Sequence, residues 1–148
     1  MTIEARGDIP VVKALFDAAR AARECAHAPY SRFKVGAALL DEQGRIHAGC
    51  NVENAAYPQG VCAEAGALSA LVLAGGTRLQ AVLVVGAGDK LCTPCGGCRQ
   101  KLREFGADTL PVLIADPTGL RAQFTLGELL PESFGPDHLD TPAPEARP

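Results

Sequence analysis

The chain has 148 residues, of which 47% are apolar and 21% charged, so it is long enough for one folded domain and too apolar for a largely disordered protein. Its net charge is −3 with scattered lysines and arginines, which argues against a nucleic-acid-binding face, and its longest apolar runs are too short to cross a membrane. The first residues, MTIEARGDIP, lack an export signal and six cysteines are too few for a disulfide scaffold, so we expect a cytoplasmic protein with reduced thiols.

An amphipathic helix is predicted at the start of the chain. Apolar residues recur at helical spacing over residues 9–28, and Pro29 ends the pattern. Residues 33–41 and 45–50 are predicted to be strands, and the turn EQG between them joins the strands into a β-hairpin.

The rest of the chain alternates between predicted helices and strands. Gly75 and Gly76 end an Ala- and Leu-rich helix, and Gly106 ends a second one. In chain order we expect a helix at 62–74, a strand at 79–85, a helix at 97–105, strands at 112–115 and 121–124, and a helical turn at 126–130.

This order of elements predicts a single α/β domain over residues 1–148. Strands separated by single helices favour right-handed crossovers and partly parallel pairing. We therefore predict three α/β/α layers around a mixed sheet of about five strands. Residues 139–148 are rich in proline and acidic side chains, and we expect them to form a mobile tail.

The stretch CTPCGGC at 92–98 indicates a metal site. Cys95 and Cys98 lie three positions apart at the start of a predicted helix, where side chains project from the same side and can chelate one ion. Cys62 also opens a predicted helix, and helix N-termini favour thiolates through the dipole and free N–H groups. Two such helix starts side by side would aim three thiolates at one ion. Three protein ligands leave the fourth position of a zinc ion open for water, as in catalytic sites.

Other roles for the cysteines remain open at this point. If Cys92 also bound the ion, four thiolates would form a closed zinc site or hold an iron–sulfur cluster, and the protein would be only a binding module. Pro94 forces the residue before it into extended geometry, which favours a Cys92 that points elsewhere. Cys92 and Cys95 also have the spacing of a redox dithiol, although no thioredoxin-like pattern surrounds them. Cys25 and Cys50 are predicted to be small buried hydrophobes.

Glu64 has two interpretations by its position alone. Residues two apart on a helix do not face one another, so Glu64 is predicted to reach a water beside the metal rather than to bind the ion together with Cys62. As an acid in the first turn it could instead only complement the helix dipole.

The cysteines lie within motifs that resemble the zinc-dependent cytidine deaminases. CAE at 62–64 and PCGGC at 94–98 match the zinc signature, with a cysteine at the place of its histidine. APYSRFKVGAAL at 28–39, GCNVENAAYPQGVCAE at 49–64 and ELLPESF at 128–134 resemble the small tetrameric members of the family. The resemblance covers nearly the whole chain except its ends. It implies a cytidine deaminase-like fold, a Zn²⁺ cofactor, a nucleoside as small-molecule substrate and a homotetramer.

The resemblance also implies a reaction and roles for individual residues. Zinc held by Cys62, Cys95 and Cys98 would supply hydroxide that attacks C4 of cytidine or deoxycytidine. Glu64 would shuttle the protons, so that uridine or deoxyuridine and ammonia form, as in pyrimidine salvage. The implied substrate contacts are the ribose partners Asn51 and Glu53, the pyrimidine neighbour Phe33, and Ala63, Tyr57 and Phe134, of which Phe134 would reach a neighbouring subunit's site.

One departure from the family affects the charge of the site. Three-cysteine members commonly have Arg directly after Cys-Ala-Glu, whereas this chain has Ala65. Three thiolates outweigh Zn²⁺ by one negative charge, which makes the metal a weaker Lewis acid. Arg99, which follows Cys98, is the predicted compensating charge.

Two rival functions are consistent with these motifs. The first is a related deaminase of another aminopyrimidine nucleoside, such as the antibiotic blasticidin S. The second is a non-catalytic structural zinc protein in which Cys92 closes the site.

Overall fold

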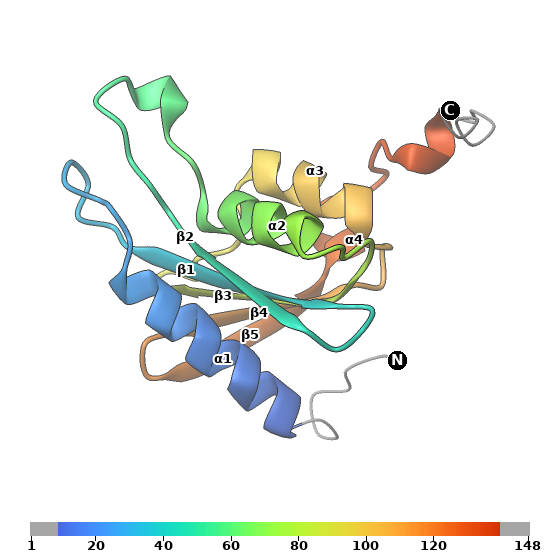
Figure 1. Cartoon of the computed structure of the whole chain (residues 1–148), viewed down its shortest axis with the longest axis horizontal. Coiled ribbons are helices and arrows are strands. Elements are labelled where there is room, and N and C mark those ends of the chain that lie inside the picture. Colours follow the sequence, from blue (N-terminus) through green and yellow to red (C-terminus); the bar gives the residue numbers. More distant parts are fainter. Residues whose placement is uncertain (1–8, 140–148) are drawn as a thin grey trace.

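A five-stranded mixed sheet forms the middle layer of the structure, a computed structural model in which residues 9–139 are described (Figure 1). The strand order is β2-β1-β3-β4-β5; β3 and β4 pair in parallel, whereas the pairs β1–β2, β1–β3 and β4–β5 are antiparallel. The strands are β1 (Val35–Asp41), β2 (Ile46–Cys50), β3 (Leu79–Gly86), β4 (Pro111–Asp116) and β5 (Gly119–Thr125). The predicted tail at 139–148 lies, except for Leu139, outside the described residues.

Helices cover both faces of this sheet, which confirms the predicted three-layer α/β/α fold (Figure 1). Successive side chains of a strand point to opposite faces, so on β3 Val82 and Val84 pack with α2 and α3 while Leu83 and Val85 pack with α1. Within residues 9–139, no helix is both long and apolar enough to cross a membrane. The helices are α1 (Ile9–Glu24), α2 (Ala63–Leu73), α3 (Gly96–Phe105) and α4 (Leu126–Leu129), with the 3₁₀ helices η1 (Tyr57–Gln59) and η2 (Pro136–His138).

The nine predicted helices and strands occur in the predicted order, and the first helix is the element whose observed length differs most from the prediction. It ends at Glu24 rather than near Ala28, so the prediction for its last turn is wrong. The residue before Pro29 is disfavoured in helical geometry, and His27 instead forms a bridge with Val52 in the segment that follows β2. The two 3₁₀ helices lie outside the predicted elements.

The start of α2 lies very close to β2. A Cβ atom added to Gly49 would lie 2.5 Å from the carbonyl oxygen of Ala63 and 2.3 Å from the backbone nitrogen of Ala67. Any side chain larger than hydrogen would push α2 away from the sheet. Because Cys62 is the N-cap residue of α2, this contact sets where its sulfur lies.

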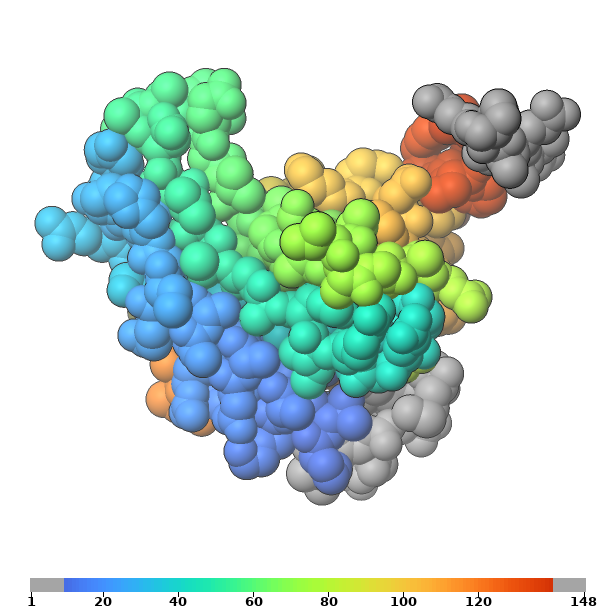
Figure 2. Space-filling view, in the orientation of Figure 1, coloured from blue at the N-terminus to red at the C-terminus, as the bar shows by residue number. Residues whose placement is uncertain are grey.

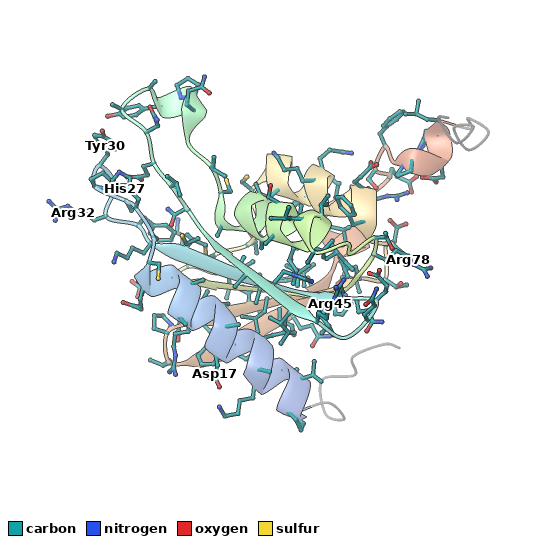
Figure 3. All side chains as sticks on the ribbon, in the orientation of Figure 1. Asp17, His27, Tyr30, Arg32, Arg45 and Arg78 are labelled. Atoms are coloured by element: carbon teal, nitrogen blue, oxygen red, sulfur yellow. The ribbon has the colours of Figure 1, made fainter. Side chains whose placement is uncertain are left out.

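A buried carboxylate fastens the β1–β2 hairpin at its turn. Asp41 accepts hydrogen bonds from Arg45 Nε at 2.7 Å and from the backbone nitrogens of Arg45 and Gln43 at 2.9 Å, and it lies 2.8 Å from His47 Nε2. Burial alone would raise the pKa of Asp41, but the bonds from His47, Arg45 and Gln43 outweigh burial and hold this pKa well below its usual range. Figure 3 shows Arg45 near the turn of the β1–β2 hairpin, well away from Tyr30 in this view.

Replacing Asp41 with asparagine is expected to lower the free energy of unfolding at pH 7 by about 3 kcal/mol, because a buried charged acceptor is lost. The folded-state pKa of Asp41 is below its unfolded value. Its contribution is therefore complete above the unfolded pKa of about 4 and is lost as the pH falls toward the folded pKa. Urea unfolding of parent and variant should show a smaller difference at pH 3 than at pH 7.

The matched control for this experiment is Asp17→Asn, because Asp17 forms an exposed ion pair with Lys13 on α1. This change should have little effect on unfolding at either pH. If Asp41→Asn lowered the free energy of unfolding by the same amount at pH 7 and at pH 3, the negative charge of Asp41 would not be what stabilises the hairpin.

Candidate metal centre and active site

Two helix starts bring three cysteine sulfurs together. Cys62 is the N-cap residue of α2, Cys95 is the N-cap residue of α3, and Cys98 lies buried in the first turn of α3. The three Sγ atoms all lie within 4.8 Å of one another. The arrangement is the one that the sequence predicts, with the two helix starts side by side.

The spacing of these sulfurs fits a zinc ion. Zn–S bonds in tetrahedral sites are about 2.3 Å long, which places neighbouring sulfurs about 3.8 Å apart. The sulfurs of Cys62 and Cys95 are 3.8 Å apart. Burial raises the pKa of the Cys98 thiol, and the nearby Glu64 and Cys62 raise it further, so three thiolates here require a cation. At Cys95 burial raises the pKa, but the hydrogen bonds from the backbone N–H of Cys98 and from the thiols of Cys98 and Cys62 together outweigh burial and lower it.

Cys92 stands apart from this group of three. Its sulfur is not among those that lie within 4.8 Å of one another. Its side chain packs beside Gly86 at the end of β3, where an added Cβ atom would lie 2.6 Å from the Cys92 sulfur. Burial raises the pKa of Cys92 to about 11, which keeps the thiol neutral. The geometry therefore favours three protein ligands and an open fourth position over a closed site.

Glu64 is buried next to the three sulfurs. The residue is only 4% exposed, and the Cys98 thiol donates a hydrogen bond to its carboxylate. Burial raises the pKa of Glu64, as is typical of a carboxyl group that exchanges protons in catalysis. A residue that only complemented the helix dipole would need no such burial. The preceding Ala63 is fully buried in the core, and its contact with the substrate remains a prediction.

Asn51 and Phe33 meet at the start of β1. Nδ2 of Asn51 donates to the carbonyl oxygen of Phe33 at 2.8 Å, and Oδ1 accepts from the backbone nitrogen of Val35 at 2.8 Å. The Phe33 side chain is half exposed and reaches the end of β3, where its Cζ lies 3.6 Å from a Cβ built on Gly86. Phe33 therefore lies on the same strand end as Cys92, and Asn51 fixes the backbone that carries it.

Glu53 is tied to the loop before β1. Its carboxylate accepts hydrogen bonds from the backbone nitrogens of Tyr30 at 2.9 Å and Ser31 at 3.1 Å, and from the Ser31 hydroxyl. The exposed ring of Tyr57 meets that of Tyr30 edge-on at 5.8 Å. Tyr30 and Ser31 are candidate site residues that the sequence did not predict, although both lie within APYSRFKVGAAL. A cavity of about 370 Å³ is lined by Tyr30, Ser31, Glu53, Asn54, Tyr57 and Gly60.

Two predicted residues lie away from the sulfurs in the structure. Arg99 donates to Pro94 O at 2.7 Å, to Leu129 O at 2.7 Å and to Thr93 Oγ1 at 3.1 Å, so these bonds go to the neighbouring loop and to α4 rather than to a thiol. Phe134 is 56% exposed, and its carbonyl oxygen accepts a hydrogen bond from Gln100 in the middle of α3, whereas Cys95 and Cys98 lie at the start of that helix. The charge of Arg99 and the substrate contact of Phe134 remain predictions.

Comparison with known proteins agrees with this geometry. The 41% identical cytidine deaminase of Sporosarcina psychrophila aligns over 128 residues, which are 86% of this chain and 94% of that protein. The Mycobacterium tuberculosis cytidine deaminase is 47% identical over 114 residues, which are 77% of this chain and 82% of that one. The crystal structure of the Burkholderia pseudomallei cytidine deaminase superposes with a TM-score of 0.76 at 46% identity, covering 82% of this chain and 98% of that chain.

A family profile extends the agreement to the metal-binding motifs themselves. The profile described as the cytidine and deoxycytidylate deaminase zinc-binding region matches residues 11–114, a range that includes all three clustered cysteines and Glu64. Sequence, fold and site thus agree, and the chain belongs to the zinc-binding cytidine and deoxycytidylate deaminase family.

Proposed function

We propose that this protein hydrolyses cytidine and deoxycytidine to uridine and deoxyuridine with release of ammonia, and that it does so in cytoplasmic pyrimidine salvage. The observation that carries the proposal is the buried Glu64 carboxylate beside the sulfur of Cys98, within a group of three thiols that leaves a zinc ion one open position. The cytidine deaminases that this chain resembles over most of its length support the choice of substrate.

The roles of the chain's own residues follow from this arrangement. Cys62, Cys95 and Cys98 would hold zinc, which when bound supplies a Lewis acid that lowers the pKa of water toward about 7. Glu64 accepts a proton from the water whose oxygen attacks C4 of the pyrimidine. The acid then donates this proton to N3, takes the remaining proton from the new C4 hydroxyl, and passes it to the C4 amino group, so that ammonia leaves and C4=O forms as the C–N bond breaks. Burial of Glu64 keeps bulk water away from these transfers.

We propose that Asn51 and Glu53 make the site prefer a nucleoside to a free base. The Asn51 amide can donate and accept hydrogen bonds, the Glu53 carboxylate can accept them, and both side chains lie in the segment after β2. Glu53 lines the 370 Å³ cavity, so a ribose hydroxyl that entered it could share the carboxylate with Ser31. Sites that meet a hydroxyl with buried polar groups reject ligands that lack it. Phe33 is proposed to pack against the pyrimidine.

A homotetramer is proposed because the chain has two separate exposed apolar surfaces. The outer side of α2 exposes Leu73 by 90% and Val72 by 52%, beside a groove between α2 and α3. The rim of the candidate site exposes Tyr57 by 75% and Phe33 by 45%. Two different surfaces that each pair with themselves across a two-fold axis generate a closed tetramer. Sedimentation that shows only monomer would exclude this assembly.

Replacing Arg99 with alanine is expected to lower turnover about tenfold while zinc is retained, because Arg99 both adds positive charge near Cys98 and fixes the loop at Pro94. The lysine variant should keep part of the activity, since it keeps the charge but not the planar donors. The measurements are kcat and zinc content of each variant. Equal activity of Arg99→Ala and parent at full zinc loading would rule out the role of Arg99.

Ammonia release from a panel of substrates tests the proposed function. We expect fast release from cytidine and deoxycytidine and slow release from cytosine, which lacks the sugar. Preferential release from blasticidin S would instead support the related antibiotic deaminase. A zinc-loaded protein that is inert on the whole panel would support the non-catalytic zinc protein.

A further inference from the structure

A second cavity lies at the loop formed by residues 26–34, and its lining is basic. Its volume is about 430 Å³, and among the described residues no acidic side chain lines it. Figure 2 shows this loop, in light blue, at the outer edge of the molecule, and Figure 3 shows Arg32 pointing away from the body of the molecule. The residues that line this basic cavity are Ala26, His27, Ala28, Pro29, Arg32 and Lys34.

The cationic side chains of the basic cavity have hydrogen-bond donors left for a ligand. Within residues 9–139, the Arg32 guanidinium forms no hydrogen bond and no ion pair. The Lys34 ammonium donates to the carbonyl oxygen of Glu24 at 3.1 Å, which leaves two of its three N–H donors. The Glu24 carboxylate itself accepts from Arg23 Nη1 at 3.0 Å, so this acid is already paired. Free donors on two cations fit an anionic ligand.

The backbone at Arg32 is strained. Arg32 has φ of 61°, in the left-handed region that residues other than glycine seldom adopt, and its backbone nitrogen donates to the carbonyl oxygen of Ala28 at 3.0 Å. Such strain is common at ligand-binding sites and switches. A guanidinium offers a phosphate two parallel N–H donors, and the remaining phosphate oxygens can accept from the Lys34 ammonium and the His27 ring. The donor set therefore favours a phosphate group.

The same loop also holds the proposed ribose partner, Glu53. The backbone nitrogens of Tyr30 and Ser31 donate to the Glu53 carboxylate at 2.9 and 3.1 Å. The backbone nitrogen of Glu53 donates to the carbonyl oxygen of His27 at 2.8 Å. An anion bound to His27 and Arg32 would fix the chain on both sides of Tyr30 and Ser31. Fixing these donors in advance reduces the cost of ordering the loop when a nucleoside binds.

We propose that the basic cavity binds a phosphate group, either as the free anion or as part of a nucleotide, and that the bound phosphate strengthens nucleoside binding through the loop that holds Glu53. The effect on the nucleoside rests on the proposed function, whereas the phosphate site itself does not. Coupling between two binding sites is reciprocal, so a bound nucleoside strengthens phosphate binding by the same factor.

Calorimetric titration of the zinc-loaded protein with inorganic phosphate and with AMP, at an ionic strength held constant with chloride, tests the site. Arg32→Gln and Lys34→Gln should each raise Kd about tenfold, because each removes a charge-assisted hydrogen bond. Arg32→Lys should raise it less, since it keeps the charge but not the planar donors. If neither glutamine variant weakened the binding of either ligand, the phosphate would bind elsewhere and the inference would be overturned.

The matched control for this titration is Arg78→Gln. Arg78 is an exposed arginine outside the basic cavity, and it lies well away from Arg32 in the view of Figure 3. The substitution makes the same change of net charge, so it should leave Kd unchanged. Adenosine, which has the base and sugar of AMP without its phosphate, should not bind to the basic cavity.

Steady-state kinetics at saturating phosphate tests the coupling. We expect KM for cytidine to fall about fivefold with kcat unchanged, and uridine to lower Kd for phosphate by the same factor. Arg32→Gln should abolish this response. An effect of AMP alone would assign the site to a nucleotide, and an effect of inorganic phosphate alone would assign it to the free anion. A KM that neither ligand changes would overturn the coupling. Failure of the proposed function is distinguishable, because the protein would then release no ammonia from cytidine while calorimetry still detected bound phosphate.

Discussion

Glu64→Gln is expected to lower kcat for cytidine by about 10³- to 10⁴-fold, the largest effect of any single change that leaves the metal site intact. Glutamine has nearly the same shape and can still hydrogen-bond near Cys98, but it cannot accept or donate the protons that the reaction moves. Zinc content should stay at the parent level, because the three sulfurs are untouched. The experiment compares kcat, zinc content and binding of the product uridine in variant and parent.

The matched control is Glu24→Gln, which removes an exposed carboxylate at the end of α1. It should change kcat by less than about twofold. If Glu64→Gln kept more than about a tenth of the parent's kcat at full zinc loading, Glu64 would not be the proton shuttle. If the variant instead lost zinc together with activity, the carboxylate would act on the metal site rather than on the substrate.

Cys98→Ser is expected to abolish zinc binding at neutral pH and with it essentially all activity, a loss of about 10³-fold or more. Cys98 is the buried member of the group, so serine in its place removes one of the three sulfur ligands from the interior of the site. Treating the parent with a chelator should produce the same inactive state. Readdition of Zn²⁺ should restore activity to the chelated parent but not to the variant.

Cys92→Ser is the control that makes the zinc experiment specific. Cys92 lies three residues before Cys95, yet its neutral thiol packs at the end of β3, apart from the other sulfurs. The variant should therefore keep its zinc and most of its turnover. Loss of one zinc equivalent in Cys92→Ser would show a fourth sulfur ligand and contradict an open site.

Much of the fold could be predicted because periodicity and stop signals agreed along most of the chain. The glycines after residues 74 and 105 and the apolar alternation of the strands all point to the observed elements. The first helix is where this logic failed. Its apolar pattern continues past Glu24, but pairing of His27 with Val52 takes the chain out of the helix. Such long-range pairing leaves no trace in helical spacing.

The metal ligands could be predicted and the details of the nucleoside pocket could not. Two predicted helix starts favoured a shared site for Cys62, Cys95 and Cys98, and Pro94 favoured a Cys92 that points elsewhere, but the sequence left a site with four cysteines open. The partners of Glu53 in the loop at Tyr30 and Ser31 depend on tertiary contacts over more than twenty residues. The bonds of Arg99 to Pro94 and Leu129 depend on the packing of α3 against α4, which spacing along the chain does not reveal.

X-ray absorption spectroscopy at the zinc edge of the purified protein tests the central claim most directly. Three thiolates with an open position for water predict three sulfur neighbours at about 2.3 Å and one oxygen or nitrogen neighbour at about 2.0 Å. The spectrum should be the same for Cys92→Ser. A shell of four sulfurs around the ion would contradict the account, since no position would then remain for the water that Glu64 is proposed to deprotonate.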